Sequence, residues 1–408
     1  MSLVKRQLEE LEEVLEEEDD LVEELEQDEA LSEVDTESNI EAKYDSGQAR
    51  IVIQRNDFLV PNIMQMLSNK DILDLSPTYQ RRSRWNAIKQ SHLIESLLMN
   101  VPIPPIFLYE RDLAKYEVMD GQQRLSAIRD FVDNRFALRH LTKWPELNGR
   151  RYVDLPSRIQ AGLMRRGVAA VIILTESGQD VEAAIELRQY VFERLNTGGE
   201  SLNAQEMRNC IYASPFNEML IRLARSDLFT SAWGIPPKES TEPHKVSKAL
   251  AANRLYATMS DCEIALRYFA FKDLSSFKSG VKRTLDRHMR DMRSLDEAAC
   301  RACEEEYISL LGTASRIFGE RVFRLPGKSG DLDGRRSIPL SDALLLGLHA
   351  VRGQAATLVS KSSAILDRLR DALNDEKTHE AIVGRGNTRQ AIEERIGLMR
   401  GLLQTAIA

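Results

Sequence analysis

The sequence predicts an α+β protein in which a mixed domain precedes a mostly helical one. Short apolar runs typical of β-strands lie at 106–109, 116–119 and 169–174. After about residue 180, apolar side chains recur at helical spacing and the interruptions are short. Because 408 residues exceed the roughly 100–200 of an ordinary domain, two domains and an appendage are expected.

Local signals predict the helices of the mixed domain. A short helix is expected at 63–67, and Asn86 is placed to begin a second one. The prolines at 102–105 stop that helix, because proline cannot donate a backbone hydrogen bond. A third helix should follow Gly121, directly after the strand at 116–119.

Charge and composition divide the chain into three parts. Residues 1–45 form an acidic arm, helical or partly disordered, with 19 Asp/Glu against 3 Lys/Arg. The arm has a net charge of −16 and the whole chain has a net charge of −8, so residues 46–408 have a net charge of +8. We place the mixed domain at 46–215 and the helical domain at 216–408. The arm could bind a partner, support a homo-oligomer or shield the basic body as a nucleic-acid mimic.

Composition also argues against several protein classes. No apolar run reaches the roughly 18–20 residues that cross a bilayer, so no membrane association is expected. The N-terminus turns acidic where a secretory signal needs an apolar core, which predicts a cytoplasmic protein. The only close cysteine pair, Cys300 and Cys303, lacks two further zinc ligands, so both are interpreted as ordinary helix positions.

The most informative feature is a strand that leads through one glycine into a helix. The strand ends at Asp120, and the helix follows Gly121. A helix N-terminus offers unpaired N–H groups and a partial positive charge, and glycine lets a ligand approach the backbone closely. This junction is therefore suited to a phosphate group.

The neighbouring side chains suit a nucleotide. Arg124 could neutralise phosphate charge, and Asp120 could bind Mg²⁺ or position water. Gln122 and Gln123 add amide groups that can contact a nucleotide. The same spacing also fits a structural role, with Asp120 as a helix cap and Arg124 as a surface residue.

Two further segments could reach the same place. Tyr79 and Arg81 precede Arg82, Arg84 and Trp85, which combines positive charge with aromatic surface. This segment could grip phosphate or DNA, with Arg82 and Arg84 as the nucleic-acid contacts, or it could be a solvated basic stretch.

The second segment ends a helix near Gly198. Asn203 and Glu206 follow it at the spacing of a capping box. Capping chemistry alone would explain much of this motif.

Together these motifs resemble the domain of unknown function 262, the N-terminal domain of GmrSD-type modification-dependent restriction systems. The resemblance covers roughly residues 60–280, and the ordered set of motifs is more specific than any one of them. The matching positions are Tyr79, Gln80, Arg81, Trp85, Ser96, Pro-Ile-Pro-Pro at 102–105, Asp-Gly-Gln-Gln-Arg at 120–124, Arg-Leu-Asn-Thr-Gly at 194–198 and Leu-Asn-Ala-Gln-Glu-Met-Arg-Asn at 202–209.

The resemblance implies a ParB/sulfiredoxin-like fold, binding and often hydrolysis of a nucleoside triphosphate with Mg²⁺, and a role in DNA restriction or phage defence. DNA and a separate nuclease or defence protein are the implied partners. Fold similarity does not by itself establish activity. The implied catalytic residues are Asp120, Gln123 and Arg124, with the metal on Asp120, and the implied nucleotide contacts are Gly121, Gln122, Tyr79, Arg81, Arg194, Asn196 and Thr197.

Two familiar catalytic motifs are missing from the sequence. Related restriction enzymes carry a C-terminal HNH nuclease, which needs closely placed histidines, whereas the six histidines here are scattered. Gly327, Lys328 and Ser329 look like part of a P-loop, but Val322 stands where that motif needs glycine. We therefore expect neither an HNH nuclease nor a P-loop.

Three functions remain open from the sequence. The first is a nucleotide-dependent sensor or regulator in a restriction system. The second is a module that binds DNA or a partner without nucleotide turnover. The third is a metal-dependent nuclease that uses Asp120 and Glu206.

Overall fold

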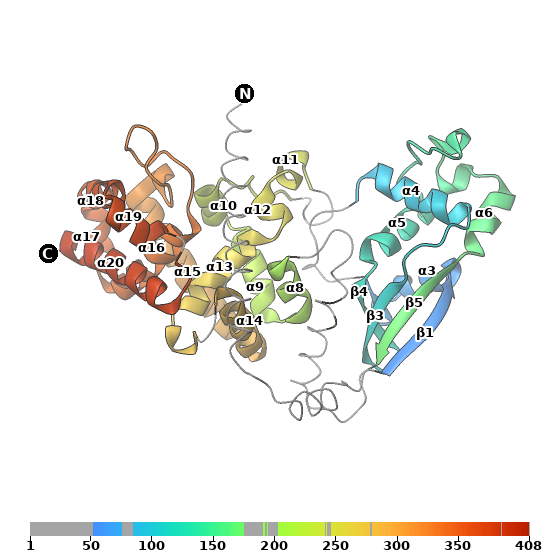
Figure 1. Cartoon of the computed structure of the whole chain (residues 1–408), viewed down its shortest axis with the longest axis horizontal. Helices are drawn as coiled ribbons and strands as arrows, with labels where there is room; N and C mark the ends of the chain where they lie inside the picture. The colour runs from blue at the N-terminus through green and yellow to red at the C-terminus, as the bar shows by residue number, and fades with distance from the viewer. Residues whose placement is uncertain are drawn as a thin grey trace, which may run out of the picture. The chain divides into compact units, whose positions relative to one another are not determined.

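The described chain forms two compact units, one N-terminal to Asn203 and one from Asn203 onward (Figure 1). The computed structural model describes residues 52–75, 85–174, 203–240, 246–277, 280–384 and 386–407, together with Val191, Arg194 and Glu242. The predicted acidic arm lies outside these residues. The predicted limits of the domains stay predictions.

A mixed five-stranded sheet organises the first unit, in the order β1-β5-β3-β4-β2. β1 is antiparallel to β5, and β3 is antiparallel to β4. β5 runs parallel to β3, and β2 runs parallel to β4. The strands are β1 (Val52–Leu59), β2 (Leu73–Asp74), β3 (Ile106–Asp112), β4 (Lys115–Asp120) and β5 (Gly167–Leu174).

The three strands predicted from apolar runs are confirmed as the three central ones, β3, β4 and β5. The two strands that the sequence did not reveal, β1 and β2, lie at the edges of the sheet. Residues 54–57 of β1 are all polar, and β2 has only two residues. An edge strand needs no continuous apolar run, because part of it faces solvent.

Four α-helices of the first unit lie in the described ranges 52–75 and 85–174, and all three predicted ones are confirmed. Asn86 caps α4 by accepting hydrogen bonds from the backbone N–H groups of Ile88 and Lys89. The buried side chains of these helices join the sheet in one apolar core. The helices are α3 (Val60–Ser68), α4 (Ala87–Leu98), α5 (Gln122–Val132) and α6 (Ser157–Met164).

The second unit is helical in all its described longer elements, as predicted. Two of its helices, α13 and α16, are buried on nearly every side, and a buried ion pair between Arg267 and Asp342 joins them at 2.7 Å. The helices are α8 (Ala204–Ile211), α9 (Pro215–Ala224), α10 (Asp227–Trp233), α11 (Lys248–Ala251), α12 (Arg254–Ala257), α13 (Ser260–Phe271), α14 (Val281–Asp291), α15 (Glu297–Phe318), α16 (Ile338–Ala350), α17 (Ala355–Ser360), α18 (Ser362–Asn374), α19 (Glu376–Val383) and α20 (Arg389–Ile407).

The cysteine pair and the Gly327 loop, both considered in the sequence, lie in this unit. Cys300 and Cys303 are free cysteines within α15, so the interpretation as helix positions is confirmed. Gly327 lies in a hydrogen-bonded loop after α15 rather than after a strand, which agrees with the rejection of a P-loop. Among the described residues, no helix is long and apolar enough to cross a membrane.

Candidate functional site

The junction between β4 and α5 requires glycine. Gly121 adopts a φ of +102°, a left-handed conformation that side-chain-bearing residues rarely take. A Cβ atom at this position would lie 2.5 Å from Cγ2 of Ile106 on β3. Both the turn and the close contact with β3 therefore depend on the missing side chain.

An ion pair links the two charged residues of this junction. Nη2 of Arg124 lies 2.6 Å from Oδ2 of Asp120. The Asp120 side chain is 51% exposed, whereas that of Arg124 is 13% exposed. No side chain caps α5, whose N-cap residue is Gly121, so the interpretation of Asp120 as a helix cap is wrong.

Arg124 reaches from the first turn of α5 into the interior of the unit. Its Nη2 donates a second hydrogen bond to the carbonyl oxygen of Pro105 at 3.3 Å. Its Nε is buried and has no hydrogen-bond partner among the described residues. A buried donor without a partner costs about 1–3 kcal/mol, so this nitrogen is a natural contact for an acceptor from a ligand or water.

Three of the sequence motifs meet at this junction. The backbone N–H of Trp85 donates to Oε1 of Gln123 at 3.0 Å. The contact between Arg124 and Pro105 adds the proline-rich motif. Tyr79, Arg81, Arg82 and Arg84, which directly precede Trp85, lie outside the described residues.

Comparison with known families decides the identity of this region. Residues 63–213 match the family model described as the GmrSD restriction endonuclease, N-terminal domain. These residues are a GmrSD-type N-terminal domain. The chain is accordingly a component of a GmrSD-type restriction system. No curated protein and no solved structure matches the chain.

The GmrSD-type match and the compact units have different limits. The match begins within α3, so β1 lies ahead of it although β1 pairs with β5 along eight residue pairs. At its other end the match includes α8, which belongs to the helical unit. The sheet that supports the junction therefore begins before the matched residues.

The last motif of the GmrSD-type domain has a structural role in the helical unit. Asn203 and Glu206 form the predicted capping box at the start of α8, with hydrogen bonds of 2.9 and 3.0 Å. Glu206 is buried, and its carboxylate serves as this cap. Arg194 is exposed and helical, whereas Asn196 and Thr197 lie outside the described residues.

Arg208, in the same motif, is a buried centre of charge that the sequence did not reveal. Its guanidinium lies 2.6 Å from Glu263 on α13 and 2.6 Å from Asp286 on α14. Burial lowers the pKa of Arg208, but the two carboxylates outweigh it and raise the pKa above its usual value. Because its partners are distant in sequence, no local pattern could have indicated this role.

Few side chains of the described residues could bind a metal ion at the junction. The described residues contain no group of three or more His, Cys, Asp or Glu side chains arranged to hold one. Asp120 offers one exposed carboxylate at the junction. Mg²⁺ commonly combines one or two carboxylates with substrate phosphates and water, so this donor set suits a metal that arrives with a nucleotide.

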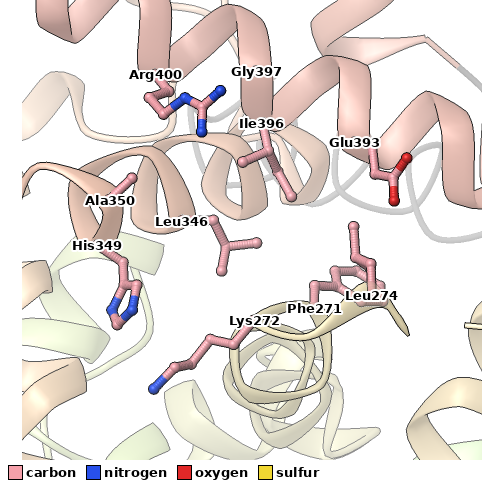
Figure 2. A pocket seen from close by; sticks show the side chains of 10 residues that line it. All are labelled: Phe271, Lys272, Leu274, Leu346, His349, Ala350, Glu393, Ile396, Gly397 and Arg400. Carbon is pink, nitrogen blue, oxygen red and sulfur yellow. The ribbon is translucent and has the colours of Figure 1, made fainter. Parts of the chain in front are cut away.

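The helical unit contains a separate cavity of about 280 Å³, lined by α13, α16 and α20 (Figure 2). His349 and Arg400 lie on one side of it and Glu393 on the other, around the apolar side chains of Leu346 and Ile396. The lining residues are distant in sequence, which explains why no motif indicated the cavity.

A polar network adjoins this cavity. The hydroxyl of Tyr268 donates to Glu306 at 2.5 Å and lies 3.0 Å from Nδ1 of His349. Because the single hydroxyl proton goes to Glu306, Nδ1 of His349 must be the donor in the second contact. Burial and the nearby Lys272 lower the pKa of His349, which favours the neutral ring.

Proposed function

We propose that this chain binds a nucleoside triphosphate with Mg²⁺ at the junction of β4 and α5, hydrolyses it slowly, and acts as a sensor or regulatory component of a GmrSD-type restriction system. The observation that carries the proposal is the junction itself. It combines an uncapped helix N-terminus, a glycine that cannot be replaced without a clash, and a partly buried arginine. The GmrSD-type match gives this site its restriction context.

The phosphates would lie against the first turn of α5. There the backbone N–H groups and the helix dipole favour negative charge. Arg124 is already held at this turn by Pro105, and its Nε has no partner among the described residues. It can therefore turn its guanidinium toward a phosphate oxygen without leaving its position.

Asp120 and Arg124 must exchange partners when a nucleotide binds. Their ion pair occupies the two groups that a phosphate and a cation would need. Mg²⁺, when bound, would neutralise phosphate charge and polarise the phosphate that is attacked. Asp120 would then hold the cation or orient a water molecule, and Gln123 would keep the backbone of Trp85 against α5.

The test is a calorimetric titration of the full chain with each of the four ribonucleoside triphosphates and Mg²⁺, with phosphate release measured in parallel. Saturable binding with slow release of phosphate supports the proposal. Binding without release would reduce the function to a ligand-gated module. No binding of any nucleotide would overturn the proposal.

A further inference from the structure

The chain between α5 and β5 is rich in basic side chains. This basic segment, residues 136–166, contains seven Lys/Arg and two Asp/Glu, a net charge of +5. The whole chain carries −8. The segment includes α6, which is labelled in Figure 1, and the short helices η1 (Pro145–Leu147) and η2 (Tyr152–Asp154).

Most of this charge is not neutralised by neighbouring carboxylates. Arg135, just before the segment, pairs with Asp130 and Asp133. Within the segment, Arg166 is bound to Asn100 and to a backbone carbonyl. The other six basic side chains are exposed, and none forms an ion pair with a carboxylate among the described residues; they are Arg139, Lys143, Arg150, Arg151, Arg158 and Arg165.

The segment is held in place mainly through its backbone, although the side chains of Arg150 and Arg151 also donate to backbone carbonyl oxygens. On α4, Ser91 Oγ accepts from the N–H of Arg139 at 2.9 Å, and His92 donates to the carbonyl oxygen of His140 at 3.0 Å. One turn later, Glu95 accepts from the N–H groups of Lys143 and Trp144 at 2.8 and 2.9 Å. The side chains of Arg139 and Lys143 therefore remain available to a partner.

The nearby acids do not cancel the charge. Glu95 is buried beneath the segment, and counting it still leaves a net charge of +4. Asp154 accepts a hydrogen bond from the N–H of Arg151 and so stabilises the local turn. The Debye length is about 8–10 Å at physiological salt, so basic side chains that lie near one another in this segment reinforce each other's attraction for a polyanion.

An exposed aromatic side chain adds to this surface. Trp144 is 38% exposed, and its backbone is fixed by Glu95. A basic surface with an aromatic side chain is suited to a polyanion that also presents flat or apolar groups. DNA has both properties, and the restriction context makes it the appropriate polyanion.

We infer that the basic segment, residues 136–166, binds the phosphodiester backbone of DNA. Arginine and lysine contacts of this kind position a protein on a duplex without reading its sequence. The inference goes beyond the proposed nucleotide site, because it involves other residues and requires no nucleotide. It also differs from the earlier prediction of Arg82 and Arg84 as DNA contacts, which lie outside the described residues.

The test compares two variants of the full chain that lose the same charge. The first replaces Arg139, Lys143, Arg158 and Arg165 by Ala, side chains for which the structure shows no hydrogen bond or ion pair. The matched control replaces four exposed cations of the helical unit by Ala, namely Lys238, Lys248, Arg368 and Lys377. Binding to a fluorescent duplex DNA is measured by anisotropy over a series of salt concentrations, without nucleotide.

The segment variant should bind DNA at least tenfold more weakly at low salt, and its affinity should depend less steeply on salt. Each lost phosphate contact should reduce the slope of log K against log salt by about 0.9. The control should resemble the original protein. Equal affinity of the two variants, or an equal loss in both, would overturn the inference, as would tighter binding of RNA or anionic vesicles than of duplex DNA.

Two further measurements keep this outcome independent of folding and of the proposed function. The double variant Arg158→Glu and Arg165→Glu, at an exposed position of α6 and at its exposed C-cap, should also weaken DNA binding while the thermal unfolding midpoint stays unchanged. The segment variant should bind nucleotide as the original protein does. Arg124→Ala should bind DNA normally, so a failure of one site is distinguishable from a failure of the other.

Discussion

At the scale of single residues, Gly121 is the position whose chemistry is most narrowly constrained. Its positive φ and the 2.5 Å approach of a Cβ to Ile106 both disfavour any side chain. We predict that Gly121→Ala destabilises the protein by about 1–3 kcal/mol, the usual cost of such backbone strain. Chemical denaturation should show the loss, and Gly149→Ala is a matched control at another positive φ, where a Cβ would meet no atom within 4 Å.

A smaller loss at Gly121 than at Gly149 would contradict this view of the junction. The control is itself strained by its φ of +84°, so the difference between the two variants isolates the contact with Ile106. The absence of a side chain at Gly121 is what lets the start of α5 lie this close to β3.

Asp120 should make nucleotide binding depend on Mg²⁺. Without the cation, its carboxylate would face phosphate charge once Arg124 had turned away. We predict that chelation of Mg²⁺ weakens nucleotide binding at least tenfold in the original protein and by less in Asp120→Asn, because the repulsion is absent in that variant. Titrations with and without a chelator measure both effects.

If the original protein and Asp120→Asn depended equally on Mg²⁺, Asp120 would not take part in the nucleotide site. Asp112→Asn is a suitable control, because Asp112 is also an exposed carboxylate paired with a basic residue, Lys115, in the same sheet. Its change should leave the dependence as it is in the original protein.

At the scale of elements, α4 fixes the basic segment through the Glu95 carboxylate. Burial raises the pKa of Glu95, but hydrogen bonds from the backbone of Trp144, Lys143 and Thr142 outweigh burial and lower the pKa below its usual value. A carboxyl group whose pKa is lowered on folding stabilises the protein above its unfolded pKa. That stability is lost as the pH falls through the folded pKa.

We therefore predict that Glu95→Gln lowers the free energy of unfolding by about 1–3 kcal/mol at neutral pH, because charged hydrogen bonds are replaced by neutral ones. The difference from the original protein should shrink on acidification below about pH 4, where an unperturbed glutamate becomes protonated. Denaturation across this pH range measures it. A difference that does not change with pH would show that the charge of Glu95 is unimportant.

The helix α8 depends on the buried Arg208. Removing one partner from a buried ion pair costs about 3–5 kcal/mol, because the other charge is left unpaired. We predict a loss of this size for Glu263→Gln and Asp286→Asn combined, measured by thermal unfolding. Arg222 and Glu304 form a more exposed pair, and Glu304→Gln should change stability by less than about 1 kcal/mol.

The elements also show what the sequence could and could not reveal. Strong local signals, such as the apolar strands and the Asn86 cap, predicted β3, β4, β5 and α4 correctly. The polar edge strand β1 was not predicted, because its place in the sheet depends on pairing with β5. The Asp120–Arg124 contact needed the structure, since spacing alone was equally compatible with a capping role for Asp120.

At the scale of the whole molecule, charge is divided unevenly along the chain. Removing residues 1–45 would change the net charge from −8 to +8. If the acidic arm competes with DNA for the basic body, this truncation should tighten DNA binding at low salt, and the gain should diminish as salt screens the charges. Anisotropy titrations measure it, and equal affinity at low salt would count against shielding.

The family match and the compact units together describe a GmrSD-type domain that is continuous with a helical unit. The motif at 202–209, part of the resemblance to that family, begins α8 and contributes the buried Arg208 to the helical unit. The same short motif thus contributes to the family resemblance and to the buried interior of the helical unit. The ion-pair partners of Arg208, which are Glu263 and Asp286, could not be identified from the sequence alone.

We propose that nucleotide phosphates bind at the first turn of α5, where Arg124 lies. The most direct test of this proposal is a calorimetric titration of the original protein, Arg124→Ala and Arg129→Ala with a nucleoside triphosphate and Mg²⁺. Arg129 lies on the same helix but pairs with Asp130, so its change controls for loss of charge. Arg124→Ala should bind at least tenfold more weakly, from the loss of roughly 1.5–3 kcal/mol, and Arg129→Ala should bind as the original protein does. Equal affinities in all three proteins would contradict the proposal.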